Sequence, residues 1–195
     1  CGPIICYRDW QTFKQGSCGQ AALHQEVRIN SSDPANVPGE ILTKGPNVLL
    51  GYYKNEEDTS QTIDKDGWFH TGDLGLMDED GNVFIKGRSK NMLLGSNGQN
   101  IYPEEIEDKL NSLPLVAECL VIQNGEKLIG LVHPDYDEAQ NLGLNADDLK
   151  NIMDENRTQL NTIVPAYCKV AEIRIQEEEF EKTPKKSIKR FLYTE

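Results

Sequence analysis

The sequence contains no long hydrophobic run and few of the residues that metal sites and disulfide frameworks require. No apolar stretch approaches the roughly 18–20 residues of a membrane-spanning helix. The three histidines, His24, His70 and His133, are far apart, and the five cysteines are odd in number and form no Cys-x-x-Cys pair. These absences argue against a membrane span, a zinc site and a disulfide framework, and favour reduced thiols in the cytosol.

Positive charge is also scarce, because 20 basic residues face 32 acidic ones and the net charge is -12. Nucleic acids and anionic membranes are polyanions, so this balance argues against either as a general partner. A hydrophobic content of 37% is nevertheless enough for a core. The 195 residues allow one large domain or two small ones.

Local patterns divide the chain near residues 87–91. The first part contains short polar–apolar alternations such as Glu26–Ile29 and a strong turn at Asp78–Gly81, which predict strands. The second part has Pro103 at a first helical position, an Asn124-Gly125 hairpin turn and a helix capped by Asn145. We therefore expect an α+β fold in two parts, residues 1–89 and 90–195.

Three motifs follow one another in the middle of the chain. They are Asp66-Gly67-Trp68-Phe69-His70-Thr71-Gly72-Asp73-Leu74-Gly75, then Gly87-Arg88-Ser89-Lys90, then the run from Gly95 to Glu107. Together they resemble the C-terminal third of the adenylate-forming (AMP-binding) ligases, a superfamily of acyl-CoA synthetases, peptide-synthetase adenylation domains and luciferases. The resemblance covers essentially the whole chain, and the wording of Trp68–Gly75 is most similar to long-chain fatty acyl-CoA synthetases.

This resemblance implies an organisation and an activity. Residues 1–89 would be a β-rich remnant of a large N-terminal domain, and residues 90–195 a small mobile lid. The parent would be an ATP-dependent ligase that joins a long-chain fatty acid to CoA through an acyl-adenylate, in the cytoplasm or peripherally at the inner membrane face. Its partners would be ATP, the fatty acid, CoA and the missing N-terminal domain.

The resemblance also implies that part of the site lies outside this sequence. The phosphate loop and the Glu ligand of Mg²⁺ are upstream in the family, and Cys1-Gly2-Pro3 resembles the residues that directly follow that Glu. No metal ligand is therefore assigned to this chain, and the isolated chain is expected to be inactive.

Asp73 and Arg88 are the candidate nucleotide ligands. A carboxylate accepts hydrogen bonds from two vicinal hydroxyls, and charged acceptors make the stronger bonds. The resemblance assigns Asp73 to the ribose of ATP or AMP, and Arg88 to ribose and phosphate. A lone Gly-Asp would more often cap a turn, but the two motifs in their family order favour the nucleotide.

The resemblance assigns further roles to a hinge and a loop. Lys90 occupies the hinge position, and its competing interpretation is an ordinary exposed lysine. Gly95 and Gly98 flank a loop that lines the tunnel for the pantetheine arm of CoA in the family. The same loop is also a turn before the Pro103 helix, since glycine tolerates positive φ and close backbone approach.

The C-terminal run Thr183–Arg190 departs from the family pattern. Alignment on its Pro, Ile and Arg places Ser187 where the family has a lysine that stabilises negative charge as the adenylate forms. Lys186 is our candidate for this role, with Lys189 as the other neighbour. The cluster is otherwise a solvated basic tail.

Two other functions remain open. The chain would instead belong to an adenylation domain that loads a carrier protein, or it would be a non-catalytic interaction module. His70 is expected to have a packing or hydrogen-bonding role, and Trp68 and Phe69 to be core or interface residues.

Overall fold

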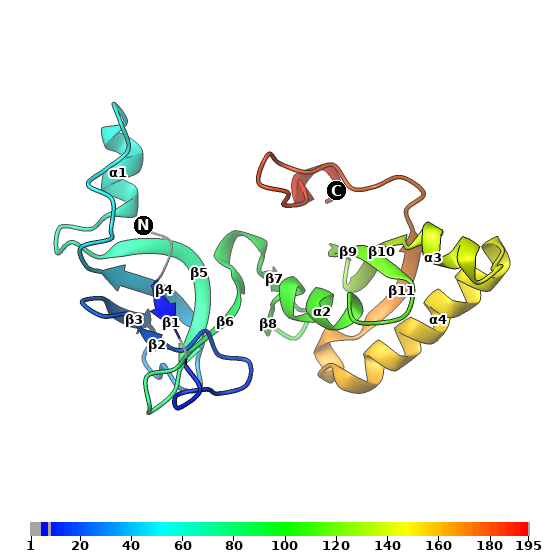
Figure 1. Cartoon of the computed structure of the whole chain (residues 1–195), viewed down its shortest axis with the longest axis horizontal. Coiled ribbons are helices and arrows are strands. Elements are labelled where there is room, and N and C mark those ends of the chain that lie inside the picture. Colours follow the sequence, from blue (N-terminus) through cyan, green and yellow to red (C-terminus); the bar gives the residue numbers. More distant parts are fainter. Residues whose placement is uncertain (1–4, 8, 195) are drawn as a thin grey trace. The chain divides into compact units, whose positions relative to one another are not determined.

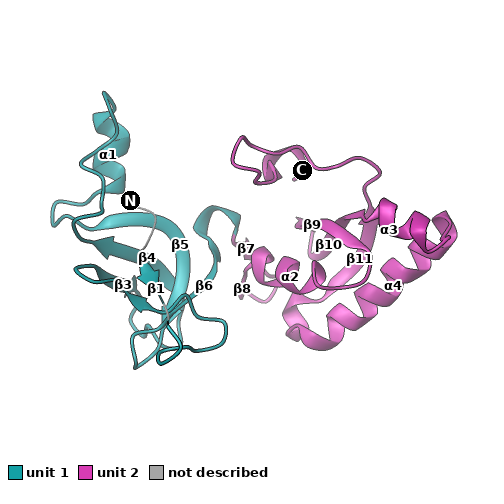
Figure 2. Ribbon diagram, viewed as in Figure 1, with its two compact units in different colours: residues 1–91 teal, residues 92–195 magenta. Residues whose placement is uncertain are grey.

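The structure, a computed structural model, describes residues 5–7 and 9–194 (Figure 1). The chain forms two compact units, residues 1–91 and residues 92–195 (Figure 2). The α+β class expected from the sequence is confirmed, because both units contain strands and helices.

Unit 1 is built around a four-stranded antiparallel sheet of order β3-β4-β5-β6. Its elements are β1 (Cys6–Tyr7), β2 (Gln20–Ala21), β3 (Glu26–Asn30), β4 (Gly39–Lys44), α1 (Glu56–Thr62), β5 (Phe69–Met77), β6 (Val83–Arg88) and η1 (Ser89–Asn91). Its hydrophobic cluster is small, with Ile29, Ile41 and Val83 fully buried. Helix α1 begins after Asn55, whose side chain accepts a hydrogen bond from the backbone N–H of Asp58.

The turn between β5 and β6 forms as predicted. The backbone N–H of Gly81 donates to the carbonyl of Asp78 at 3.0 Å, and Gly81 has a φ of +81° that suits glycine. The Asp78 carboxylate accepts from the backbone N–H of Asn82 at 2.8 Å. Because this turn closes β5 onto β6, it brings Asp73 opposite Arg88 in the sheet register.

Unit 2 is a three-stranded sheet of order β11-β10-β9, covered by helices. Its elements are β7 (Leu93–Leu94), β8 (Asn100–Ile101), α2 (Pro103–Leu110), β9 (Val116–Asn124), β10 (Lys127–Pro134), α3 (Tyr136–Asn141), α4 (Ala146–Ile163), η2 (Ala166–Cys168), β11 (Val170–Ile175) and η3 (Arg190–Leu192). Strand β10 pairs antiparallel with β9 and parallel with β11. The predicted hairpin, the Pro103 start of α2 and the Asn145 cap of α4 are all confirmed.

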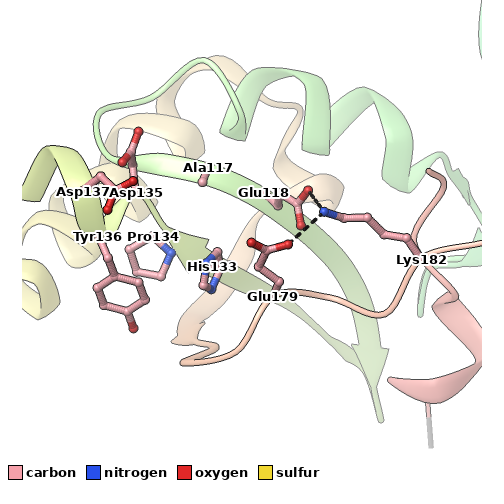
Figure 3. Close-up of a pocket in the computed structure, with 9 residues that line it drawn as sticks. All are labelled: Ala117, Glu118, His133, Pro134, Asp135, Tyr136, Asp137, Glu179 and Lys182. Atoms are coloured by element: carbon pink, nitrogen blue, oxygen red, sulfur yellow. Dashed lines mark hydrogen bonds and ion pairs between the residues drawn. The ribbon is translucent and has the colours of Figure 1, made fainter.

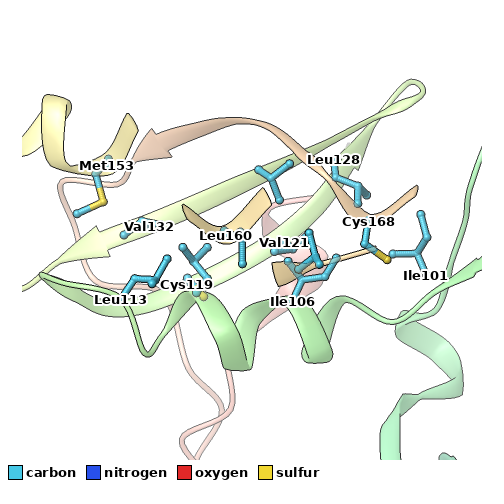
Figure 4. Packing of buried hydrophobic residues seen from close by; sticks show 13 residues of the cluster. Ile101, Ile106, Leu113, Cys119, Val121, Leu128, Val132, Met153, Leu160 and Cys168 are labelled. Atoms are coloured by element: carbon cyan, nitrogen blue, oxygen red, sulfur yellow. The ribbon is translucent and has the colours of Figure 1, made fainter. Parts of the chain in front are cut away.

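Both faces of this sheet are covered, as the alternation of buried residues along β9 shows. Cys119 and Val121 join the cluster that α2 and α4 complete (Figure 4), whereas Leu120 and Ile122 face the opposite cluster. The opposite cluster contains Phe180 from the C-terminal segment, with Ile188 and Tyr193 packed against it. The segment after β11 is therefore folded back onto the sheet.

The described cysteines are free thiols that fill space. Burial raises the pKa of Cys168 to about 11, and burial together with nearby Cys18 raises that of Cys6 to about 11. Burial also raises the pKa of Cys119. These three thiols remain protonated at neutral pH and are poor nucleophiles. Cys1 lies outside the described residues.

Candidate functional site

Asp73 and Arg88 form an ion pair across neighbouring strands of unit 1. Arg88 Nε lies 2.9 Å from Asp73 Oδ1, and the two residues are directly opposite in the β5–β6 register. The Asp73 side chain is 32% exposed and that of Arg88 is 59% exposed, so a ligand in solvent can reach both. The structure thus brings together the two residues that the sequence assigned to the nucleotide.

The backbone beside Asp73 is bent by a register shift in β5. Gly72 has a φ of +72°, and the nearest atom to a Cβ added there would be Arg88 Nη1 at 3.7 Å. A larger residue at this position would therefore be limited by backbone conformation more than by space. Thr71 Oγ1 donates to the Ile41 carbonyl at 2.7 Å and accepts from the Asp73 N–H at 3.0 Å, which holds the bend in place.

Glu40 is a supporting residue that the sequence reasoning missed. Its carboxylate accepts hydrogen bonds from the Gly72 N–H at 3.0 Å and from His70 Nδ1 at 2.8 Å. His70 therefore has a hydrogen-bonding role, as expected. Nothing in the sequence pairs position 40 with position 72, because the contact depends on the β4–β5 register.

Trp68, just before β5, lies beneath a cation. The guanidinium carbon of Arg28 is 4.1 Å from the Trp68 ring centroid, and Lys44 Nζ is 6.0 Å from it. Trp68 is thus engaged within unit 1.

Lys90 lies in the short 3₁₀ helix η1, which is one turn long, and is exposed. This turn ends at Asn91, the last residue of unit 1. The hinge role of Lys90 stays a prediction.

The Gly95–Gly98 loop is the turn of the β7–β8 hairpin. The Gly95 N–H donates to the Gln99 carbonyl and the Gly98 N–H to the Gly95 carbonyl, both at 2.8 Å, and Gly98 has a φ of +77°. A Cβ on Gly95 would lie 3.0 Å from Asn97 Oδ1, so the turn is tight there.

An open cavity of about 220 Å³ lies beside this loop. Gly95 borders it, together with Tyr167 and two exposed lysines, Lys127 and Lys169. Glu126 also lines it. No sequence pattern indicates these lysines, because both are far from the loop along the chain and meet it only through the sheet.

The C-terminal lysines are carried on a tight hairpin. The Lys186 N–H donates to the Thr183 carbonyl, and the Thr183 N–H to the Ser187 carbonyl, both at 2.8 Å. Lys186 has a φ of +61°, the left-handed position that follows a type I turn in a three-residue hairpin loop. Both Lys186 and Ser187 are exposed. The structure presents both positions on the loop, and which of them acts stays a prediction.

The base of this hairpin borders a second cavity, of about 390 Å³ (Figure 3). Lys182 contacts Glu118 at 2.5 Å and Glu179 at 3.4 Å, and His133 lies nearby with its Nδ1 3.0 Å from the Gln176 carbonyl. Four of the nine residues that line the cavity are acidic, and Lys182 occupies one side of it.

Across residues 5–7 and 9–194, no group of three or more His, Cys, Asp or Glu side chains is placed to hold a metal ion. Within the same residues, no helix has the length and apolar character needed to cross a membrane.

An antiparallel unit with a Thr-Gly-Asp bend, followed by a helix-backed sheet with a lysine hairpin, is the arrangement expected from the resemblance to the adenylate-forming family. The family model described as AMP-binding enzyme C-terminal domain matches residues 90–195, and the chain belongs to this family.

Named relatives agree with this family. A 2-succinylbenzoate–CoA ligase of Bacillus cytotoxicus is 43% identical over 127 residues, which are 64% of this chain and 26% of the relative. An indoleacetate–CoA ligase of Aromatoleum aromaticum is 42% identical over 130 residues, 62% of this chain and 25% of the relative. The chain thus spans about a quarter of the length of these relatives.

A solved structure gives the same result. The O-succinylbenzoate coenzyme A synthetase (MenE) of Bacillus subtilis, in complex with AMP, is 26% identical with a TM-score of 0.69. The match covers 91% of this chain and 35% of that chain. The adenylate-forming resemblance is therefore confirmed. The narrower likeness to long-chain fatty acyl-CoA synthetases is not, because these relatives are named for aromatic acids.

Proposed function

We propose that this chain is the nucleotide-facing and CoA-facing C-terminal portion of an AMP-forming acid–CoA ligase. The observation that carries the proposal is the exposed Asp73–Arg88 pair at the Thr71–Asp73 bend, in a chain of the AMP-binding family. The reaction would join a carboxylate and ATP into an acyl-adenylate and pyrophosphate. The CoA thiol would then attack the acyl carbon and release AMP.

In this proposal Asp73 binds the nucleoside. Its carboxylate accepts hydrogen bonds from the two ribose hydroxyls, and the Thr71 and Glu40 contacts hold the bend so that little ordering is needed on binding. Arg88, already paired with Asp73, presents its remaining N–H groups to ribose and phosphate. ATP would supply the adenylyl group, and pyrophosphate would be the leaving group. Among the described residues, no group of His, Cys, Asp or Glu side chains fits Mg²⁺.

Lys186 would supply positive charge while the adenylate forms. Negative charge develops at the phosphorus as the carboxylate attacks, and a fixed ammonium nearby stabilises it without reorganisation. The left-handed backbone at Lys186 places this lysine on an ordered turn. Ser187, at the aligned position, carries no charge of its own.

CoA would bind at the β7–β8 hairpin of unit 2. The Gly95–Gly98 turn offers backbone that a narrow pantetheine chain can approach, and Lys127 and Lys169 border the adjoining cavity. CoA carries phosphates, so these lysines would attract its nucleotide end. A Lys127→Ala, Lys169→Ala variant would then raise the KM for CoA and leave adenylation unchanged.

The acid substrate is proposed by chemical class. The named relatives use 2-succinylbenzoate and indoleacetate, so an aromatic carboxylic acid is the first candidate. A long-chain fatty acid, expected from the wording of Trp68–Gly75, is the second.

Acid-dependent exchange of labelled pyrophosphate into ATP tests the proposal. The assay needs the longest natural polypeptide that contains this chain, called the full-length protein below. Exchange with an aromatic acid, followed by an acyl-CoA product when CoA is added, is the expected result. Exchange without a CoA product would favour a carrier protein as acceptor, and the absence of exchange with any acid would overturn the enzyme assignment.

A further inference from the structure

A buried carboxylate connects the lysine hairpin to the rest of unit 2. Glu107, on α2, is 9% exposed. One of its oxygens accepts the Val121 N–H at 2.6 Å, and the other accepts from Arg190 Nη2. Arg190 Nη1 also donates to the Val121 carbonyl at 3.3 Å. Helix α2, strand β9 and the C-terminal segment therefore meet at one carboxylate.

This contact differs in kind from the other anchor of the hairpin. Burial raises the pKa of Glu107, while the Arg190 charge and the Val121 hydrogen bond act in the opposite direction. The side chains of Glu107 and Arg190 are 12% and 19% exposed, whereas those of Glu118 and Lys182 are 27% and 28% exposed, so solvent screens the second pair more strongly. Loss of Glu107 would leave Arg190 with the more distant Glu104, at 4.0 Å, as its charged partner, whereas Lys182 would keep Glu179 at 3.4 Å if Glu118 were lost.

The position of the buried pair relates it to both functional hairpins. Arg190 follows Ser187 by three residues, and Ile188, between them, packs on the sheet. Helix α2 begins at Pro103, two residues after β8 closes the Gly95–Gly98 turn. The pair thus connects the end of the lysine hairpin to the helix that follows the glycine hairpin.

We propose that Glu107 is a positioning residue for adenylation, which acts through Arg190 to hold the Lys186 hairpin at one fixed place on the sheet. The proposal rests on the proposed function. Glu107 itself contacts no substrate. An error of about 1 Å in the placement of a catalytic group can cost about 100-fold in rate, so a hairpin loose at one end would be a poor source of charge.

Glu107→Gln in the full-length protein tests this role. Glutamine is nearly isosteric and still accepts the Val121 N–H, but it removes the charge that holds Arg190. We expect adenylation, measured by pyrophosphate exchange, to fall about 10- to 100-fold. Thioester formation from supplied acyl-adenylate should stay within about twofold, because that step does not use the lysine hairpin. Equal losses in both half-reactions, or unchanged adenylation, would overturn the proposal.

Glu118→Gln is the matched control, because it removes the carboxylate of the exposed anchor at the other end of the same hairpin. Its effect on adenylation should be clearly smaller than that of Glu107→Gln. An equal or larger effect would contradict a special role for the buried pair.

A double variant, Glu107→Gln with Arg190→Gln, separates positioning from stability. It removes both charges of the pair and leaves Glu104, which lies 4.0 Å from Arg190 Nη2 and is 30% exposed, as the remaining carboxylate there, so it should melt near the wild-type temperature even if Glu107→Gln alone does not fold. Adenylation should nevertheless stay low, because the Glu107–Arg190 contact no longer holds the hairpin to α2. Restoration of adenylation together with stability would show a merely structural role and overturn the proposal.

Amide hydrogen exchange gives a readout independent of activity. In Glu107→Gln, the Thr183 and Lys186 N–H groups should exchange faster than in the wild type, while the Gly130 N–H in the central strand should not. Unchanged amide hydrogen exchange at Thr183 and Lys186 would show that the Glu107–Arg190 contact does not hold the hairpin. If the wild type showed no pyrophosphate exchange, this would count against the proposed function. Amide hydrogen exchange would still show whether Glu107 holds the lysine hairpin through Arg190.

Discussion

At the scale of single residues, Asp73 combines accessibility with a fixed position. Its carboxylate is reachable from solvent, yet its backbone N–H is held by Thr71 and its side chain by Arg88. A carboxylate held in this way binds vicinal hydroxyls with little further ordering.

Replacement of Asp73 by Ala should weaken ATP binding to the full-length protein about 10- to 100-fold, the usual value of hydrogen bonds to a charged group. Calorimetric titration with ATP measures this change. Asp66→Ala is the control, since Asp66 is an exposed aspartate of the same motif but lies in the turn before β5. Equal affinity in Asp73→Ala and the wild type would refute the ribose role.

Asp78 should make unit 1 sensitive to acid. Desolvation acts to raise its pKa, but the Lys14 hydrogen bond at 2.6 Å and those from Asn82 prevail and lower the pKa from 3.8 to about 2. A carboxyl with a depressed pKa stabilises the fold above its unfolded pKa, and the contribution is lost as the pH falls. The unfolding free energy of unit 1 should therefore decrease between about pH 4 and pH 2.

Fluorescence measures this decrease specifically, because both tryptophans, Trp10 and Trp68, are in unit 1. Asp78→Asn should reduce the dependence on pH, whereas Asp80→Asn, whose side chain is 75% exposed, should change it little. An unaltered pH profile in Asp78→Asn would contradict the assignment.

At the scale of elements, the glycine hairpin (β7–β8) and the C-terminal lysine hairpin of unit 2 have different constraints. The Gly95–Gly98 turn uses glycine for its left-handed residue, whereas the C-terminal turn places Lys186 in that conformation. The left-handed conformation costs a non-glycine residue about 1–2 kcal/mol, so the C-terminal turn is the more strained of the two.

Lys186→Ala should lower adenylation about 100-fold in the full-length protein while thioester formation from supplied acyl-adenylate is kept. Lys185→Ala, on the same exposed turn, is the control and should change neither half-reaction by more than about twofold. Similar losses in both half-reactions of Lys186→Ala would argue against a role specific to adenylation.

The elements also show what the sequence can predict. The Asn124-Gly125 turn, the Pro103 helix start and the Asn145 cap are local, since each depends on residues within one turn of one another. The sequence did not predict the roles of Glu40, Glu107 or the two lysines Lys127 and Lys169. Their contacts either join residues that are far apart in the chain or depend on the register of paired strands. The order of the motifs predicted the candidate nucleotide residues Asp73 and Arg88, but only the structure shows that the two form an ion pair.

At the scale of the whole molecule, the two units differ in the size of their cores. Among the described residues, the cluster of unit 1 has three fully buried hydrophobic side chains, while the helix-covered cluster of unit 2 alone has thirteen. Buried apolar area is the main favourable term in folding, so the units should differ in stability.

Chemical denaturation should therefore proceed in two steps, with unit 1 unfolding first. Tryptophan fluorescence reports unit 1, and circular dichroism at 222 nm reports mainly the helices of unit 2. The fluorescence midpoint should fall at the lower denaturant concentration. Coincident curves would show that the units unfold as one cooperative body.

The parallel pairing of β10 with β11 has a consequence for synthesis on the ribosome. Strand β10 ends at Pro134 and its partner begins at Val170, so α3 and α4 must emerge before the strand edge can be closed. Contacts between distant segments form slowly, and an open strand edge invites pairing with other chains. The nascent polypeptide would thus carry an unprotected edge until β11 has been translated. Premature termination before β11 would release an aggregation-prone product with an open strand edge, which would be a substrate for chaperones and proteases.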